Sequence, residues 1–306
     1  MNSIKIFSPA TVANVSCGFD ALGFAINTVG DEMILTKTTE KGVKISKIEG
    51  AELTFDSSKN AASVVSLAML DKANADFGID MQLFKKVKPG SGLGSSASSA
   101  AGAAFATNEL LGKPFSLLEL TDFARIGEKI ACGSPIADNV AAAIYGGFIL
   151  VKSYDPLEIV KLPVPNELWV AIIHPQIEVK TEDARNVLKP TVSIADAVKQ
   201  SANFAGLVSG LYTDDYQLIS RSLIDVIAEP YRKKLIPLFD EVKQAGIQNG
   251  ALGIGISGSG PTIFGLCKGE DATNKVAKAM EKVYQNSTID FNIYISKVNT
   301  EGVIIL

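Results

Sequence analysis

The sequence predicts an α+β protein built as a two-layer sandwich of sheet and helices. Short apolar runs of β type alternate along the chain with stretches whose apolar side chains recur at helical spacing. The chain has 306 residues, which is enough for about two domains with their own cores. It contains no internal repeat and no low-complexity segment.

The first half of the chain mixes strands and helices. Val65 and Met69 lie on one face of an expected helix, and the next helix is rich in Ala and stops at Gly112. Ser116 and Glu119 have the spacing of a capping box, which predicts a helix start. The expected strands are residues 4–7, 33–37 and 81–87. The expected helices are residues 60–72, 95–111 and 116–127.

A segment with several prolines between residues 152 and 167 has no helical period, and it predicts the domain boundary near residue 160. We therefore expect an N-terminal domain over 1–160 and a C-terminal domain over 161–306. In the second domain the expected strands are residues 169–174, 253–256, 262–266 and 291–297. Its expected helices are residues 194–211, 215–227, 233–245 and 271–284.

Composition excludes several classes of protein. Lys and Arg number 29 and Asp and Glu number 33, a formal net charge of −4, so neither a nucleic acid nor an anionic membrane is an expected partner. Cys17, Cys132 and Cys267 lie far apart, which predicts neither a disulfide framework nor a zinc site. We see no signal-peptide core and no apolar run long enough for a bilayer, and we expect a cytoplasmic protein.

The strongest local signal is a glycine-rich turn that leads from an expected strand into an expected helix. Gly90, Gly92 and Gly94 permit close backbone approach, and a helix N-terminus offers unpaired N–H groups to an anion. Ser95 stands where a Walker loop needs Lys and where a dinucleotide-binding loop needs its third Gly, so the turn is neither. We expect it to hold the phosphates of a nucleoside triphosphate through Lys88, Pro89, Gly90, Ser91, Gly92, Leu93, Gly94, Ser95, Ser96, Ala97 and Ser98.

Two further segments must be considered together with this turn. Residues 253–262 taken alone are an ordinary hairpin loop, and residues 8–23 carry Asn14 followed by Gly18-Phe19-Asp20. In this order and spacing, the three segments resemble the motifs of the GHMP kinase superfamily. The first motif, together with residues 181–185 and 229–232, is similar to that of its homoserine kinase family. The resemblance covers nearly the whole chain.

The resemblance implies a fold and its ligands. The N-terminal domain would be a ribosomal-protein-like α+β unit with a left-handed βαβ crossover, and the C-terminal domain would be ferredoxin-like, with the site between them. ATP and Mg²⁺ are the implied cofactors, and a homodimer is expected from the family. Asn60 matches a family position near the adenine, although a helix N-cap is an equally good interpretation of it.

The implied substrate is L-homoserine, which carries a carboxylate, an ammonium and a primary hydroxyl. Arg185 and Arg232 can hold the carboxylate as guanidinium forks, and Asp20 can pair with the ammonium. Asn14 and Asn139 can orient the hydroxyl. The residues assigned to the substrate are Asn14, Asp20, Thr181, Arg185 and Arg232.

The resemblance assigns metal binding to Glu128 and to the hydroxyl of Ser96 or its neighbour Ser95. The base that would deprotonate the substrate hydroxyl is harder to find. Asn139 stands where several relatives have Asp, and a carboxamide cannot accept the proton. We expect direct attack by the hydroxyl, with Asp138 as the alternative base.

Some alternatives stay open at this stage. Ile136 and Ala137 occupy a stretch where homoserine kinases often carry His, so no imidazole is expected there, and His174 is interpreted as a packed residue at a strand end. The chain could instead phosphorylate another small alcohol, such as mevalonate or shikimate. It could also be a catalytically inactive regulator that binds a nucleotide.

Overall fold

A computed structural model describes residues 1–306, and it contains two sheets, each covered by helices. The first sheet has seven strands in the order β11-β1-β2-β4-β3, and β5 pairs with β2 and with β6. Its strands are β1 (Ser3–Ala13), β2 (Leu22–Thr38), β3 (Val43–Glu49), β4 (Gly78–Phe84), β5 (Phe148–Tyr154), β6 (Leu157–Leu162) and β11 (Ile304–Ile305). Only β3 and β4 run parallel, and α1 connects them.

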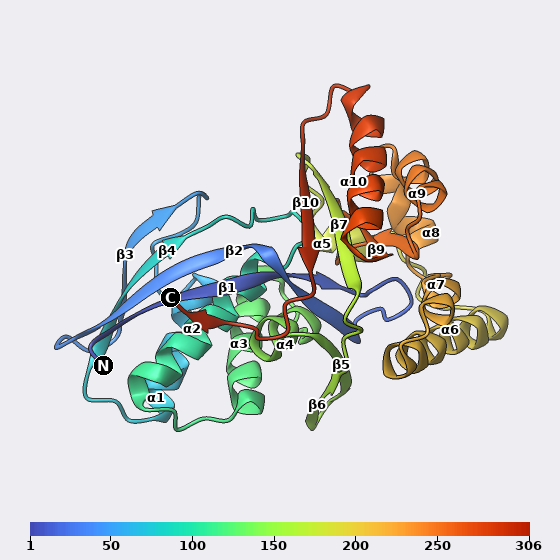
Figure 1. The fold of residues 1–306 in the computed structure, drawn as a ribbon. Coiled ribbons are helices and arrows are strands. Elements are labelled where there is room, and N and C mark those ends of the chain that lie inside the picture. Colours follow the sequence, from blue (N-terminus) through green and yellow to red (C-terminus); the bar gives the residue numbers. More distant parts are fainter.

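One face of this sheet is covered by helices (Figure 1). They are α1 (Ala61–Lys72), α2 (Ser95–Leu111), α3 (Leu117–Cys132) and α4 (Asp138–Tyr145). Their alanine-rich faces and the strands share one core of 30 buried residues. Small side chains let α2 lie close to the strands, which fixes the start of this helix beside the first motif.

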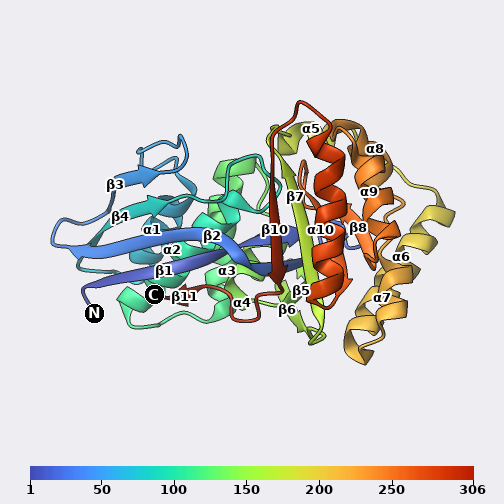
Figure 2. The same cartoon turned by 45° about the horizontal axis from the view of Figure 1, so that its top comes forward.

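The second sheet has the strand order β10-β7-β9-β8, with every pair antiparallel. Its strands are β7 (Leu168–Pro175), β8 (Gly253–Ile256), β9 (Ile263–Lys268) and β10 (Phe291–Lys297). Helices α9 (Phe239–Gln248) and α10 (Glu270–Gln285) cover it, and Figure 2 shows α10 lying along β10 and β7. This is the strand and helix arrangement of a ferredoxin-like unit.

The remaining helices connect β7 to α9. They are α5 (Thr181–Asn186), α6 (Ile194–Thr213), α7 (Tyr216–Ser222), α8 (Glu229–Arg232) and the 3₁₀ turn η1 (Lys233–Leu235). A separate core joins both units, because side chains of β1 and β2 pack there against β7, β9, α6 and α7. No helix has both the length and the hydropathy that crossing a bilayer requires.

The structure confirms the α+β class and corrects several elements. The strand predicted at 4–7 extends over Ser3–Ala13, because Pro9 sits beside a register shift between β1 and β2, where its missing N–H costs no ladder bond. The strand predicted at 81–87 begins and ends earlier, as β4. Strands β3, β5, β6 and β11 and helices α4, α5 and α8 lie where no element was predicted.

The proline-containing segment between the predicted domains is partly a hairpin. Strands β5 and β6 pair antiparallel, and Pro156 lies in the turn between them, where it interrupts no ladder. Residue 160 therefore falls inside a strand of the first sheet, and β11 brings the C-terminus back to that sheet. The division into domains at 160 stays a prediction.

Two predicted helices of the second half are shorter or displaced. The helix predicted at 215–227 ends at Ser222, because the Asp225 side chain accepts hydrogen bonds from the backbone of Ile227 and Ala228 and holds a turn there. The helix predicted at 233–245 is a 3₁₀ turn followed by α9, because Pro237 cannot continue a helix.

Candidate active site

The glycine-rich turn forms a loop between β4 and α2, which we call the phosphate loop (residues 88–94). Gly90, Gly92 and Gly94 all have positive φ, at 71°, 79° and 65°. A Cβ on Gly92 would lie 2.6 Å from the carbonyl oxygen of Ser257 and 2.7 Å from that of Gly260. Glycine is therefore required there by both conformation and space.

The other two motifs hold this loop by hydrogen bonds to its carbonyl groups. Ser257 Oγ donates to the Gly92 carbonyl at 2.6 Å, and Thr262 Oγ1 donates to the Ser91 carbonyl at 2.6 Å. From the first motif, the Thr11 amide donates to Leu93 at 3.1 Å. The three motifs thus meet at one place.

A cavity of about 340 Å³ opens in front of the phosphate loop and extends to α5 and α8. Side chains and backbone from both units line it. The predicted site residues at its wall are Asn14, Asp20, Asn60, Pro89, Gly90, Ser91, Gly92, Gly94, Ser95, Ser96, Glu128, Asp138, Asn139, Thr181, Arg185 and Arg232.

Four residues assigned to nucleotide binding do not line the cavity. Leu93 and Ala97 are buried in the hydrophobic cores, because the helix and the loop turn their apolar side chains away from the opening. Ser98 Oγ donates to the Ser8 carbonyl at 2.9 Å, and Ser8 Oγ donates back to Ser98 at 2.7 Å, which joins α2 to β1. These side chains support the loop from behind.

Lys88 is the fourth of these residues, and its side chain is exposed. Its Nζ donates to Gln176 Oε1 at 2.6 Å, and Gln176 Nε2 lies 3.1 Å from His174 Nδ1. Burial, with a smaller effect from Lys88, lowers the pKa of His174 to about 4. His174 is a packed residue at the end of β7 and lies outside the cavity wall.

The far end of the cavity carries an ion pair. Arg185 Nη2 on α5 donates to both carboxylate oxygens of Asp20 at 3.1 Å, and each side chain is about one third exposed. Asp20 has a φ of 55°, and it is held by its amide, which donates to Asn14 Oδ1 at 3.0 Å. Asn14 Nδ2 donates to the Gly258 carbonyl at 2.8 Å, so both ends of this carboxamide position the first motif.

Arg232 is a second guanidinium at this end, and it is only 4% exposed. Its Nη1 donates to the Gly258 carbonyl and its Nε to the Ala184 carbonyl, both at 2.9 Å. Its guanidinium carbon lies 4.8 Å from the centre of the Phe19 ring. Burial lowers its pKa, an effect opposed by the Asp20 carboxylate.

Two buried carboxyl groups face the middle of the cavity. Burial raises the pKa of Glu128 to about 7, opposed by a hydrogen bond with Ser96 and by the Lys85 charge. Burial, reinforced by the Asp20 charge, raises the pKa of Asp138 to about 7. Glu128 Oε1 is buried without a hydrogen-bond partner, which is unusual for a carboxyl oxygen.

Asn139 lies next to this acid, at the start of α4. Its backbone N–H donates to Asp138 Oδ1 at 2.7 Å, and its own Oδ1 accepts from Thr11 Oγ1 at 2.7 Å. Gly94 is packed against the same carboxamide, since a Cβ there would lie 2.9 Å from Asn139 Oδ1. The Asn139 side chain is thus fixed between the first motif and the phosphate loop.

Sequence reasoning missed part of the cavity wall. Lys85 is the most notable case, a buried lysine paired with Asp31 that directly follows β4, and no sequence signal distinguishes it from the exposed Lys86 beside it. Other unpredicted wall residues include Leu53, Thr54, Lys59, Ser99, Ala131, Cys132 and Ser259.

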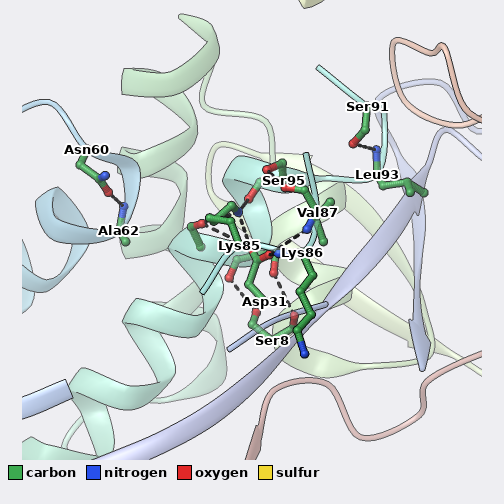
Figure 3. Close-up of polar contacts among 12 residues, drawn as sticks. Ser8, Asp31, Asn60, Ala62, Lys85, Lys86, Val87, Ser91, Leu93 and Ser95 are labelled. Carbon is green, nitrogen blue, oxygen red and sulfur yellow. Dashed lines mark hydrogen bonds and ion pairs between the residues drawn. The ribbon is translucent and has the colours of Figure 1, made fainter. Parts of the chain in front are cut away.

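Asn60 has a structural role besides its place at the wall. Its Oδ1 accepts from the Ala62 amide at 3.0 Å, as an N-cap does, and Figure 3 shows this contact. Its Nδ2 donates to the Thr54 carbonyl at 3.0 Å. Both interpretations of Asn60 are therefore compatible, because a helix cap here also forms one wall of the cavity.

The chain matches two protein families. The family described as GHMP kinases N terminal domain matches residues 59–147, and GHMP kinases C terminal matches residues 207–286. A homoserine kinase of Chlorobium phaeovibrioides is 44% identical, with 100% of both chains covered. One of Chloroherpeton thalassium is also 44% identical, over 99% of each chain.

Two solved structures share the fold of this chain. A homoserine kinase from Cytophaga hutchinsonii superposes with a TM-score of 0.97 at 49% identity, covering 100% of this chain and 98% of that one. Mevalonate kinase of L. major has a TM-score of 0.74 at 18% identity over 96% of both chains, which shows a shared fold. On the full-length identity and the three motifs assembled around one cavity, this chain belongs to the homoserine kinase family of the GHMP kinases.

Proposed function

We propose that this protein is an ATP-dependent homoserine kinase. It transfers the terminal phosphoryl group of ATP to the hydroxyl of L-homoserine and forms O-phospho-L-homoserine and ADP, a step of threonine biosynthesis. The observation that carries the proposal is a single cavity with a glycine-rich anion loop at one end and the Asp20–Arg185 pair at the other. Relatives named homoserine kinase cover the whole chain.

At the nucleotide end, backbone N–H groups do most of the binding. The first turn of α2 has no intrahelical acceptors for its N–H groups, and the positive φ of Gly94 opens the backbone toward the cavity. Ser91 and Ser96 add hydroxyl groups at the same wall. Asn60 and the Thr54 backbone form the wall that we assign to the adenine.

The residues present fit a Mg²⁺ ion. Glu128 Oε1 is a buried carboxylate oxygen without a partner, and the neighbouring Ser96 hydroxyl supplies a second hard oxygen. Mg²⁺ favours such oxygen donors and takes its remaining ligands from phosphates and water. When bound, it neutralises charge on the phosphates of the nucleotide.

At the substrate end, the two ends of the amino acid meet opposite charges. Asp20 binds the ammonium, and Arg185 and Arg232 bind the carboxylate. Thr181 lies at the first turn of α5 and adds a hydroxyl at the wall. Because Arg185 and Asp20 pair with each other, the charged substrate replaces one ion pair by two.

The hydroxyl is oriented by Asn139, whose position is fixed by Thr11. Phosphoryl transfer has a loose transition state, so positioning and charge supply most of the acceleration, and the proton can leave late. A second mechanism uses Asp138 as the general base. Its pKa of about 7 favours that role, since a base is most effective near the working pH.

The test is a substrate panel. Purified protein with ATP and Mg²⁺ is given L-homoserine, mevalonate or shikimate, and ADP release is followed. We expect turnover with homoserine alone. Turnover of mevalonate or shikimate but not homoserine contradicts the proposal, and ATP binding without turnover of any alcohol indicates a regulator. Glu128→Gln measures the background of ATP hydrolysis.

The homodimer and the cytoplasmic location stay predictions. Analytical sedimentation tests the homodimer.

A further inference from the structure

A buried lysine lies at the base of the phosphate loop, at the inner wall of the cavity. The side chains of Lys85 and Asp31 are 2% and 1% exposed, and they form an ion pair (Figure 3). Lys85 Nζ also donates to the Ser95 carbonyl and to Ser99 Oγ, each at 2.8 Å. All three ammonium donors therefore have protein acceptors. We call Asp31, Lys85, Ser95 and Ser99 the loop clamp.

The loop clamp joins the two ends of the phosphate loop. Lys85 follows the last residue of β4, and Ser95 begins α2. Ser95 Oγ adds a second connection by donating to the Val87 carbonyl at 2.6 Å. Asp31 Oδ1, from β2, accepts from the amides of Lys86 and Val87 at 2.9 and 3.0 Å. The conformation of the loop is thus set from its base.

Stability alone does not account for such a pair. Burying two charges costs desolvation energy that their attraction only roughly repays, and apolar residues of similar size commonly do as well. What an apolar pair could not supply is a donor to the Ser95 carbonyl. In a trans peptide the carbonyl and the following N–H point in opposite directions. The hydrogen bond from Lys85 therefore also fixes the N–H of Ser96, in the helix turn that faces the cavity.

We propose that Lys85 is a positioning residue for nucleotide binding, which orients the first turn of α2 through the Ser95 carbonyl. The inference rests on the proposed function, since it takes the phosphate loop as the nucleotide site. The Lys85 side chain acts through Ser95 and Ser99, and homoserine binds at the far end of the cavity. Loss of the loop clamp therefore weakens nucleotide binding and leaves substrate binding intact.

The test uses a paired substitution, because Lys85→Met alone leaves Asp31 buried without a partner. In the double variant Asp31→Asn/Lys85→Met, the new amide oxygen can still accept from Lys86 and Val87. ADP and L-homoserine affinities are measured separately by titration calorimetry in EDTA, so that no metal contributes. Lys86→Met is the matched control, since Lys86 is the exposed neighbour paired with Glu32.

We expect the double variant to fold, shown by circular dichroism, and to bind ADP at least about tenfold more weakly. Its homoserine affinity should stay within about twofold of the original protein, and Lys86→Met should change neither. A folded double variant with unchanged ADP affinity, or with equal losses for both ligands, overturns the proposal.

Ser99→Ala keeps the proposal testable if the double variant does not fold. It removes one acceptor of Lys85 and no charge, and we expect about a threefold loss of ADP affinity with unchanged homoserine affinity. Unchanged ADP affinity in Ser99→Ala would contradict the positioning role of Lys85. A failure of the proposed function looks different, because the unsubstituted protein would then fail to bind or phosphorylate homoserine, whatever the effect of the Lys85 variants on ADP affinity.

Discussion

Different chemical groups form the two ends of the cavity: backbone groups at one end and charged side chains at the other. At the nucleotide end, glycine conformations and hydrogen bonds to backbone carbonyls define the phosphate loop, and buried residues hold it from behind. At the substrate end, the charges of Asp20 and Arg185 define the site, and both side chains are about one third exposed. A backbone site is formed before its ligand arrives, whereas an exposed ion pair can be exchanged for contacts with a charged ligand.

The largest effect is expected at the nucleotide end, from Gly92→Ala. The new Cβ meets two backbone carbonyl oxygens within 2.7 Å at a positive φ, so the loop must move. We expect ADP affinity to fall by more than about a hundredfold, because two or more backbone N–H contacts to the phosphates, each worth about 1.5–3 kcal/mol, are lost together.

Gly112→Ala is the matched control. Gly112 has a φ of 89° but nothing within 4 Å of its Cβ position, so the substitution carries only the conformational cost of about 1–2 kcal/mol. Equal effects of the two substitutions on ADP binding would show that the close contact at Gly92 is unimportant, and the contrast between the two ends would weaken.

At the substrate end, Arg185→Ala should raise the KM for homoserine by about a hundredfold, because a charge-assisted bidentate contact is lost. The KM for ATP should change little, since the phosphate loop has no bond to Arg185. Steady-state kinetics with each substrate varied in turn measures both values. Arg221→Ala, on the exposed side of α7, serves as the control. Equal increases in both KM values would remove Arg185 from the substrate site.

Asp138 lies between the two ends of the cavity, and its raised pKa can be tested by its effect on stability. Its pKa is raised from 3.8 to about 7, so the folded protein holds this proton more tightly than the unfolded chain does. The stability from the neutral carboxyl is present at low pH and is lost as the pH rises from about 4 to 7. Asp138→Asn should therefore stabilise the protein by about 2 kcal/mol more at pH 8 than at pH 5.

Chemical denaturation at both pH values measures this difference. Thr121→Ser, a buried uncharged change on α3, should show no dependence on pH and controls for general effects. A gain from Asp138→Asn that is the same at pH 5 and pH 8 would mean that Asp138 titrates normally.

The smallest effect is expected on the turnover of the Asp138→Asn variant. If the hydroxyl attacks directly, Asp138→Asn keeps kcat within about tenfold, because the amide retains the shape of the carboxyl group. A loss of about a thousandfold or more, with ADP and homoserine binding intact, would instead assign Asp138 as the base. The assay is initial rate against saturating ATP and homoserine.

The contrast between the two ends also explains what the sequence could predict. Gly90, Gly92 and Gly94 lie within five residues of one another, and the backbone conformations that they permit are local, so the sequence alone predicts the glycine-rich loop. Asp20, Arg185 and Arg232 come from distant segments, and only the family resemblance brought them together. Neither route showed that Arg185 and Asp20 pair with each other, because a contact of this kind depends on tertiary structure.

Elements were missed for similar reasons. The β5–β6 hairpin falls in the segment that predicts a domain boundary, because its prolines hide two paired strands, and β11 is too short to show a pattern. Helix α4 begins without a side-chain cap, so Asp138 and Asn139 gave no helix signal. Lys85 stands beside Lys86 just after β4, and nothing local distinguishes the buried lysine from the exposed one, because the burial of Lys85 depends on Asp31 in a distant part of the chain.

The most direct test is a crystal structure with L-homoserine and an ATP analogue that cannot be hydrolysed. We predict that the Asp20–Arg185 pair opens, with the ammonium on Asp20 and the carboxylate on Arg185 and Arg232, while the phosphate loop keeps its present conformation. An intact Asp20–Arg185 pair with homoserine bound elsewhere, or a phosphate loop rebuilt around the nucleotide, would contradict this account of the site.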